Sequence, residues 1–179
     1  MINPEYLITH HGADSRLLTL AEMQRIYQDT HYVNLYQRYN QPRSGGEYPD
    51  IAYHILVGTD GWVYARDLDI EGYHASNYPV NINSVAICIS GNYDRDQLTP
   101  QMEIYYREAV ADVRKKLPSL KYVNGHRAYS SKSCPGGTIT NEFIKEVFDA
   151  AIKPGKPSAK VKEHLGNALA DIQKAINEL

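Results

Sequence analysis

The chain has 179 residues, of which 42% are hydrophobic and 22% are charged. This composition predicts one globular domain with its own core and argues against disorder. The formal net charge of −2 gives no indication of the basic face typical of nucleic-acid binding. No run reaches the roughly 18–20 apolar residues of a membrane span. We therefore expect neither a nucleic-acid partner nor a membrane partner.

A strand followed by a helix is predicted at the start of the chain. The segment Glu5–Ala13 reads as a strand, with the chain turning at Gly12. Thr19 and Glu22 have the spacing of a capping box, so a helix should begin near Leu20. Residues 32–50 are polar, aromatic and contain Pro and Gly, which is typical of a long loop, and long loops in compact domains are more often functional than accidental.

The middle of the chain predicts three more strands and a helix. Residues 51–67 alternate around Thr59-Asp60-Gly61, which is the pattern of a β-hairpin. Residues 84–90 form a short apolar run that fits a strand buried on both faces. Thr99 as N-cap before Pro100 predicts the start of a second helix.

A further strand over residues 120–126 and a helix over 140–152 complete the pattern. Because strands and helices intermix and one hairpin must be antiparallel, we predict an α/β fold with a mixed central sheet flanked by helices. The predicted domain covers residues 1–153.

The C-terminal residues are predicted to form a separate short helix. Residues 154–160 are a linker by composition, and residues 161–179 follow as the helix. Its apolar residues recur at spacings of four and three, as in a coiled-coil seam of little more than two heptads: Leu165, Leu169, Ile172, Ile176 and Leu179. Docking on its own domain and assembly of a homo-oligomer are both open interpretations.

The stretch "GHRAYSSKSCPGG", Gly125–Gly137, favours a metal site. His126 offers an imidazole nitrogen and Cys134 a thiolate, and both are good zinc ligands. A third ligand must come from elsewhere, and the pair His10-His11 at the end of the first strand is the obvious source. Strand side chains alternate between faces, so only one of the two can reach the metal, and alternation alone does not say which. Three protein ligands with an open fourth position are typical of a catalytic zinc.

Two other residues fit the zinc hypothesis, and the same histidine and cysteine also allow a rival chemistry. Lys132 can place a positive charge where an oxyanion develops, and Tyr53 can donate a hydrogen bond to the same oxygen. An amide or ester hydrolase follows from these parts. A Cys134–His126 nucleophilic pair is the rival use of the same residues. A disulfide between Cys88 and Cys134 is not favoured, because one lies in an apolar strand and the other in a polar loop.

Five ordered motifs carry a family resemblance: "YLITHHGA", "DIAYHILVGTDGWVYARD", "GYHASN", "NINSVAICISGNY" and "GHRAYSSKSCPGG". Together they resemble the zinc-dependent type-2 N-acetylmuramoyl-L-alanine amidases, a family that includes amidase-type lysozymes of bacteriophages and shares its fold with the peptidoglycan recognition proteins. The resemblance covers roughly residues 5–150. It implies a mixed sheet flanked by helices and one zinc ion at the floor of a substrate groove.

The resemblance also implies roles for single residues. It makes His10, His126 and Cys134 the zinc ligands, and thereby chooses between the two adjacent histidines. Tyr53 and Lys132 then match the family's catalytic residues. His74 is expected on the groove wall as a substrate-binding residue, whereas His11 and His54 are expected to be structural. His31 matches a recurrent family histidine and is left without an assigned role, although a structural one is favoured. Asn83 and Ser84 match the pattern as groups that support the backbone. The loop of residues 32–50 exceeds the minimal family pattern, and Tyr36, Tyr39 and Arg43 are its candidate substrate-binding residues.

The implied reaction is hydrolysis of the amide between N-acetylmuramic acid and the L-alanine of the peptidoglycan stem peptide. The alternative is a protein of the same fold that binds peptidoglycan without cutting it. The N-terminus lacks the pattern of a signal peptide, so we expect a phage endolysin that stays in the cytoplasm until release. A cytoplasmic recycling enzyme and a trimmed secreted enzyme are the other candidates.

Overall fold

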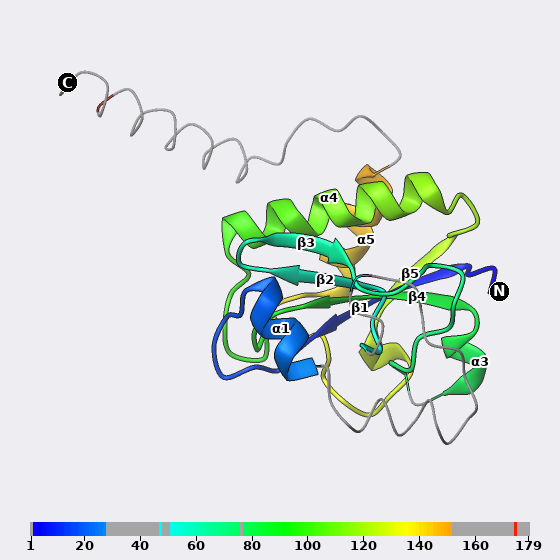
Figure 1. The fold of residues 1–179 in the computed structure, drawn as a ribbon, viewed down its shortest axis with the longest axis horizontal. Coiled ribbons are helices and arrows are strands. Elements are labelled where there is room, and N and C mark those ends of the chain that lie inside the picture. Colours follow the sequence, from blue (N-terminus) through cyan, green and yellow to red (C-terminus); the bar gives the residue numbers. More distant parts are fainter. Residues whose placement is uncertain (1, 28–46, 48–50, 76, 152–173, 175–179) are drawn as a thin grey trace.

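The computed structural model describes residues 2–27, 47, 51–75, 77–151 and 174 (Figure 1). In chain order, the elements are β1 Tyr6–His11, α1 Leu20–Tyr27, β2 Ile55–Gly58, β3 Gly61–Tyr64, α3 Tyr78–Asn81, β4 Ser84–Ile89, α4 Pro100–Lys116, β5 Tyr122–Gly125, the 3₁₀ turn η1 His126–Ala128 and α5 Asn141–Ala150. Among these residues, no helix is both long enough and apolar enough to cross a membrane.

The five strands form one mixed sheet in the order β3-β2-β4-β1-β5. Strand β1 pairs in parallel with β4 on one side and with β5 on the other, and β2 pairs in parallel with β4. Only the β2–β3 hairpin is antiparallel. The predicted α/β fold class with a mixed central sheet is therefore confirmed.

Local sequence signals fix where the helices begin. The Thr19–Glu22 capping box is formed, since the Glu22 carboxylate accepts the Thr19 N–H (2.9 Å) and the Thr19 hydroxyl accepts the Glu22 N–H (3.3 Å). The hydroxyls of Thr99 and Thr140 accept N–H groups of the first turns of α4 and α5. Such caps satisfy backbone donors that have no partner inside the helix, and each is worth about 1 kcal/mol.

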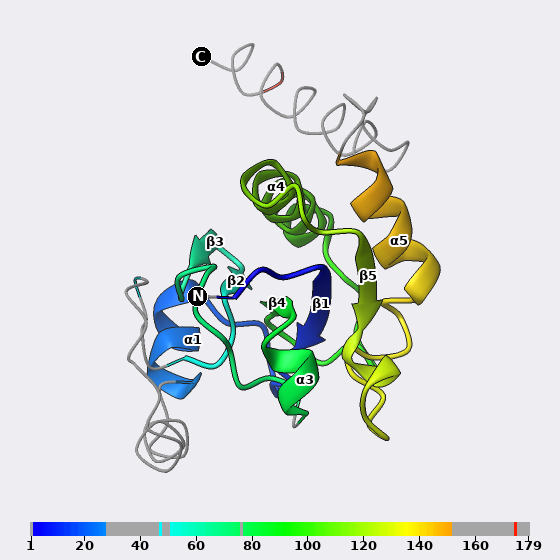
Figure 2. The same cartoon turned by 90° about the vertical axis from the view of Figure 1, so that its right-hand side faces the viewer.

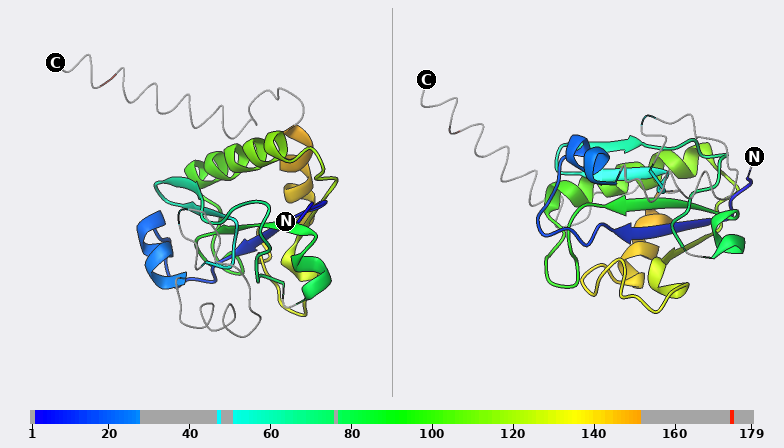
Figure 3. Two further views of the ribbon diagram at one scale, coloured as in Figure 1. Left: turned by 45° about the vertical axis from the view of Figure 1, so that its right-hand side comes forward. Right: turned by 60° about the horizontal axis from the view of Figure 1, so that its bottom comes forward.

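Helices α4 and α5 cover one face of the sheet, and α1 packs on the opposite face over β2 and β3 (Figures 1 and 2). The larger core lies between the sheet and the α4–α5 layer and includes Leu7, Val57 and Ile87. A smaller core under α1 contains Met23, Leu56 and Cys88. Figure 3 shows the same layering from two further directions.

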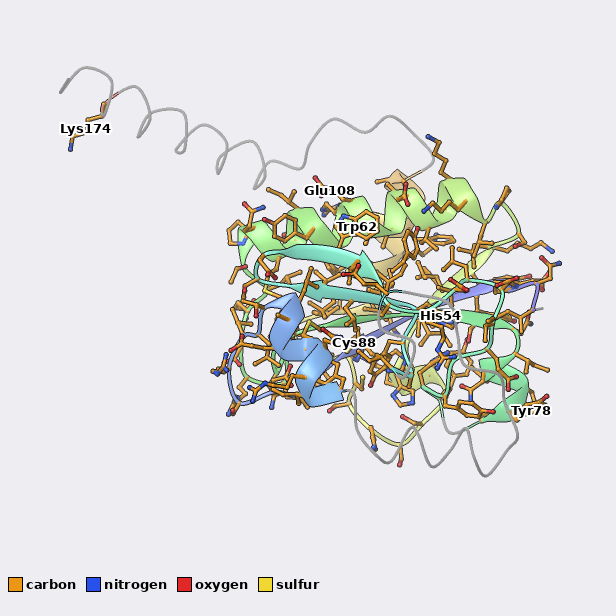
Figure 4. All side chains as sticks on the ribbon, viewed as in Figure 1. His54, Trp62, Tyr78, Cys88, Glu108 and Lys174 are labelled. Atoms are coloured by element: carbon orange, nitrogen blue, oxygen red, sulfur yellow. The ribbon has the colours of Figure 1, made fainter. Side chains whose placement is uncertain are left out.

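Alternation along the strands sends neighbouring side chains into different layers. On β1, Thr9 hydrogen-bonds to Tyr106 of α4 (2.8 Å). His10 is therefore aimed at the other face, the one that Cys88 of the paired strand β4 also faces. In Figure 4, Cys88 lies toward α1, whereas Trp62 and Glu108 lie on the α4 side.

Two short elements were not predicted from the sequence. Helix α3 spans only one turn, and η1 begins at His126, directly at the end of β5. The predicted C-terminal helix over residues 161–179 and the linker before it lie outside the described residues, apart from Lys174.

Candidate metal centre

Three buried side chains gather where β1 and β5 end. His10, His126 and Cys134 each place one ligand atom so that all three atoms lie within 4.8 Å of one another. Of these side chains, His10 is 1% exposed, and His126 and Cys134 are 7% exposed. No other group of three potential metal ligands was found among the residues that the structure describes.

Parallel strand pairing brings the two histidines together. Strands β1 and β5 are neighbours, with Thr9 opposite Gly125, so His10 near the end of β1 and His126 directly after β5 come together at the same end of the sheet. The imidazole rings of His10 and His126 consequently lie with their centroids 4.4 Å apart. Strand alternation left the choice between His10 and His11 open, and the structure shows that His10 faces this cluster.

A network of hydrogen bonds holds the loop that carries Cys134. The Arg127 backbone N–H donates to the Cys134 carbonyl (2.7 Å), and its guanidinium donates to the carbonyls of Gly136 (2.6 Å) and Ile139 (2.7 Å). The His11 N–H points at the Cys134 sulfur at 3.5 Å. Arg127 was not singled out from the sequence. Its position directly after His126 was the only available signal.

The loop around Tyr93, which follows β4, packs against the loop that carries Cys134. The Tyr93 carbonyl accepts hydrogen bonds from both the backbone N–H (3.0 Å) and the hydroxyl (2.9 Å) of Thr138. The Tyr93 N–H in turn donates to His11 Nδ1 (3.1 Å). Gly136 adopts a φ of +97° and packs against Tyr93, where a side chain would not fit.

His54 is held by backbone groups away from the metal ligands. Its Nδ1 accepts the Ala86 N–H (3.1 Å) and its Nε2 donates to the Ile70 carbonyl (2.8 Å). The ring therefore ties β4 to the segment that follows β3. Burial lowers the pKa of His54 to about 4. These contacts agree with the structural role expected for this residue.

His74, which we expected on the wall of the substrate groove, is 6% exposed and contacts His10. Its Nδ1 is 3.0 Å from His10 Nε2, and its Nε2 is 3.0 Å from the Ser84 hydroxyl. Two consecutive hydrogen bonds to buried partners occupy both ring nitrogens. The sequence shows His74 in a polar segment and contains no signal for this burial.

Burial shifts the pKa values of the groups in this cluster toward their neutral forms. Burial is the main cause that lowers the pKa of His10 far below its usual range, and the neighbouring His74 lowers it further. The pKa of His126 is also lowered, first by burial and then by the charge of Lys132. Burial raises the pKa of the Cys134 thiol to about 11.

The donor set fits a zinc ion. Two imidazoles and one thiolate are ligands that zinc prefers, and they provide three of four tetrahedral positions. His126 Nε2 is buried and has no hydrogen-bond partner within the described part of the chain. A buried polar atom without a partner costs about 1–3 kcal/mol, which a bound ion would recover. The 3.7 Å between Cys134 Sγ and His10 Nδ1 is close to the separation of two ligands on one tetrahedral metal.

The pKa shifts of these groups argue against a cysteine nucleophile. A Cys–His pair works as thiolate and imidazolium. Here burial is the main cause that raises the pKa of the Cys134 thiol and lowers that of the His126 imidazole, so the charged form of each group is disfavoured. The rival hypothesis of thiol catalysis thus lacks its ion pair.

The structure places the two predicted catalytic residues beside the cluster. The Tyr53 ring lies with its centroid 5.1 Å from that of His10 and is half-buried. Lys132 is exposed on the loop between His126 and Cys134. Three predicted substrate-binding residues, together with His31, lie outside the described residues: Tyr36, Tyr39 and Arg43.

Comparisons with known proteins agree with this arrangement. The family model described as N-acetylmuramoyl-L-alanine amidase matches residues 2–137. The chain is 36% identical over 141 residues to peptidoglycan-recognition protein SC1a of Drosophila melanogaster, which is 77% of this chain and 71% of that protein.

Solved structures show the same fold. N-acetylmuramoyl-L-alanine amidase LysC from Clostridium intestinale superposes with a TM-score of 0.62 at 23% identity, covering 83% of this chain and 87% of that one. Wild-type PGRP-LB of Drosophila superposes with a TM-score of 0.60 at 25% identity, covering 82% and 81%.

Proposed function

Because the chain belongs to the N-acetylmuramoyl-L-alanine amidase family, we propose that it hydrolyses the amide bond between N-acetylmuramic acid and L-alanine in peptidoglycan. The observation that carries the proposal is the buried cluster of His10, His126 and Cys134, whose three ligand atoms lie within 4.8 Å of one another. A protein that only recognises peptidoglycan has no need for this complete set of zinc ligands.

His10, His126 and Cys134 would hold the zinc ion. When bound, zinc supplies a Lewis acid that polarises a carbonyl and generates a nucleophile from water near neutral pH. Because only three side chains would hold the ion, one ligand position would stay open for that chemistry, and the burial of these side chains in a low-dielectric site would strengthen its electrostatic effect.

Lys132 and Tyr53 stabilise the charge that develops on the carbonyl oxygen. The Lys132 ammonium lies close enough to the cluster to lower the pKa of His126, so its positive charge acts at this site. Tyr53 carries a phenol next to His10, where it can donate a hydrogen bond to the same oxygen. Removal of one such donor typically slows the chemical step about 10²–10³-fold.

The product of the reaction tests the proposal. Purified peptidoglycan should release glycan strands without peptides and peptides that begin with L-alanine, as seen by mass spectrometry of the soluble fraction. The Cys134→Ser variant should release neither product. Products that end in new reducing sugars would identify a glycosidase and contradict the proposal.

Recognition without hydrolysis is the second candidate, because the similar Drosophila proteins are named as peptidoglycan-recognition proteins. The intact ligand set favours hydrolysis. Sedimentation of the protein with the wall, without any released product at full zinc loading, would favour recognition.

Three further expectations remain part of the proposal. We expect Tyr36, Tyr39 and Arg43 to bind the substrate, so their replacement by alanine should slow peptidoglycan hydrolysis with little change in bound zinc. Deletion of residues 161–179 should lower the mass measured by light scattering if that helix assembles a homo-oligomer.

The third expectation is the role of a phage endolysin. Bacteria that express the protein should lyse only after their inner membrane is permeabilised, and cells that express Cys134→Ser should stay intact. Lysis without permeabilisation would contradict storage in the cytoplasm.

A further inference from the structure

A relay of three hydrogen bonds runs from His10 through His74 and Ser84, away from the metal cluster. His10 Nε2 lies 3.0 Å from His74 Nδ1, and His74 Nε2 lies 3.0 Å from Ser84 Oγ. Ser84 Oγ lies 2.6 Å from the carbonyl oxygen of Val80 in α3. His10, His74 and Ser84 are all buried, and Ser84 is 0% exposed.

The direction of these bonds follows from the last one. A carbonyl oxygen only accepts, so the single hydroxyl hydrogen of Ser84 is donated to Val80. At its other contact Ser84 must therefore accept, and His74 carries its hydrogen on Nε2. A neutral imidazole has one N–H, so His74 Nδ1 is an acceptor and His10 must donate to it from Nε2. His10 Nδ1 therefore carries no hydrogen and keeps its lone pair.

The lone pair of His10 Nδ1 lies on the side of the ring that faces the metal cluster. His10 Nδ1 is the nitrogen 3.7 Å from the Cys134 sulfur. The opposite tautomer would place a hydrogen on Nδ1, toward the metal position, and two bare nitrogens against each other between His10 and His74. That arrangement would leave two buried polar atoms without a hydrogen bond, so it is disfavoured.

We propose that Ser84 and His74 are positioning residues that hold His10 in the tautomer with Nδ1 available to the metal. The inference rests on the metal site of the proposed function. Metal-binding histidines usually donate their second N–H to a carboxylate, a backbone carbonyl or water. Here an imidazole and a hydroxyl, both uncharged, take that place, and α3 provides the terminal acceptor.

The segment that carries the two residues is itself fixed. Asn81 Oδ1 accepts the N–H of Ala75 (3.0 Å), which ties the residue after His74 to α3. Ser84 begins β4 and pairs with Tyr6 of β1, the strand that carries His10. His10 and Ser84 thus lie on paired strands, and the segment of His74 is held by α3.

Nuclear magnetic resonance of the metal-free protein tests the tautomer directly. In protein labelled with ¹⁵N-histidine near neutral pH, His10 should show a protonated Nε2 and a bare Nδ1, and His74 should show the same pattern. In Ser84→Ala, His74 loses its acceptor and should shift toward the Nδ1–H form. A His10 ring protonated on Nδ1 in the unchanged protein would overturn the proposal.

Zinc affinity provides the second measurement. Ser84→Ala should bind zinc about 10-fold or more weakly, the usual effect of removing such a partner. The matched control is Ser90→Ala, which removes another fully buried serine whose hydroxyl accepts the Leu18 N–H (2.7 Å) outside the relay. It should bind zinc as tightly as the unchanged protein. Equal zinc affinity of the two variants would overturn the proposal.

The two proposals fail in different ways. If the protein shows the expected tautomer and zinc affinities but does not hydrolyse peptidoglycan, the relay stands and the proposed function is wrong. If it hydrolyses peptidoglycan while His10 carries its hydrogen on Nδ1, the function stands and the relay is wrong.

Discussion

A Cβ atom on Gly136 would lie 2.2 Å from the carbonyl carbon of Tyr93. The loop that carries Cys134 is therefore pressed directly onto the backbone of the loop that follows β4. Ser133 joins the same contact, because its hydroxyl donates to the Asp94 carboxylate at 2.7 Å. Packing between two loops, rather than a regular element, sets the position of the sulfur.

This contact predicts the effect of two adjacent glycine substitutions. Gly136→Ala should lower the free energy of unfolding by more than about 1 kcal/mol, because its φ is +97° and the new methyl meets backbone. Gly137→Ala is the control, since no atom outside its chain neighbours lies within 4 Å of where its new methyl would stand, and it should change stability by less than about 0.5 kcal/mol. Urea denaturation measures both variants, and equal stabilities would show that the contact does not matter.

Arg127 should couple stability to zinc binding. Arg127→Ala removes two charged hydrogen bonds to the carbonyls of Gly136 and Ile139, so we expect a loss of about 1.5–3 kcal/mol of stability. Zinc affinity should fall with it, because the same bonds hold the loop of Cys134. Arg107→Ala is the control, since it breaks ion pairs with Glu103 and Glu146 on the α4–α5 layer. Calorimetric zinc titration should show unchanged affinity for Arg107→Ala, and a similar loss in both variants would refute the coupling.

Much of the fold is predictable because its signals are local. The capping threonines and the Thr59-Asp60-Gly61 turn act within a few residues of themselves, so the sequence alone predicts the helix starts and the hairpin. Strand alternation likewise predicts that His10 and His11 point to opposite faces of the sheet.

The relay could not be predicted in the same way. His10 and His74 meet across 64 residues of sequence, and the burial of His74 depends on the one-turn helix α3 and on the packing of β4. The loop contact between Gly136 and Tyr93 also joins distant segments, and only the tertiary structure specifies it. The family resemblance named the three ligands and also pointed to His74 and Ser84, whereas the hydrogen bonds that join these two residues to His10 came from the structure.

Variants of the two catalytic residues should lose activity but keep their zinc, unlike variants of the metal ligands. Tyr53→Phe and Lys132→Ala should each lower kcat about 10²–10³-fold while one zinc per chain is retained, because neither residue belongs to the ligand cluster. Lys145→Ala changes another exposed lysine, on α5, and should leave kcat unchanged. Steady-state hydrolysis of a muramyl peptide, together with zinc analysis, checks this. Loss of zinc in step with loss of activity would assign both residues to metal binding instead.

Stability of the metal-free protein should fall as the pH drops through the range of histidine titration. Burial lowers the pKa of His54 from its ordinary 6.5 to about 4, so the unfolded chain binds the proton more tightly than the folded one. The stabilisation is complete above about pH 6.5 and is lost as the pH falls toward about 4. His54 alone should account for about 2 kcal/mol between about pH 7 and about pH 5.

Chemical denaturation at these two pH values, with and without His54→Gln, measures the contribution. The variant should be less stable near neutral pH and show a smaller change on acidification. Other buried histidines contribute in the same direction, among them His10 and His74, so a residual slope is expected. An identical slope in the variant would show that His54 does not titrate as described.

The most direct test of the account measures the release of peptides that begin with L-alanine from peptidoglycan, as zinc is returned to the metal-free protein. We expect release to rise in proportion to bound zinc and to stop rising at one ion per chain, without new reducing sugar ends. His126→Ala should show neither tight zinc binding nor release. Full release by the metal-free protein, or no release from the zinc-loaded protein, would contradict a zinc-dependent amidase built on His10, His126 and Cys134.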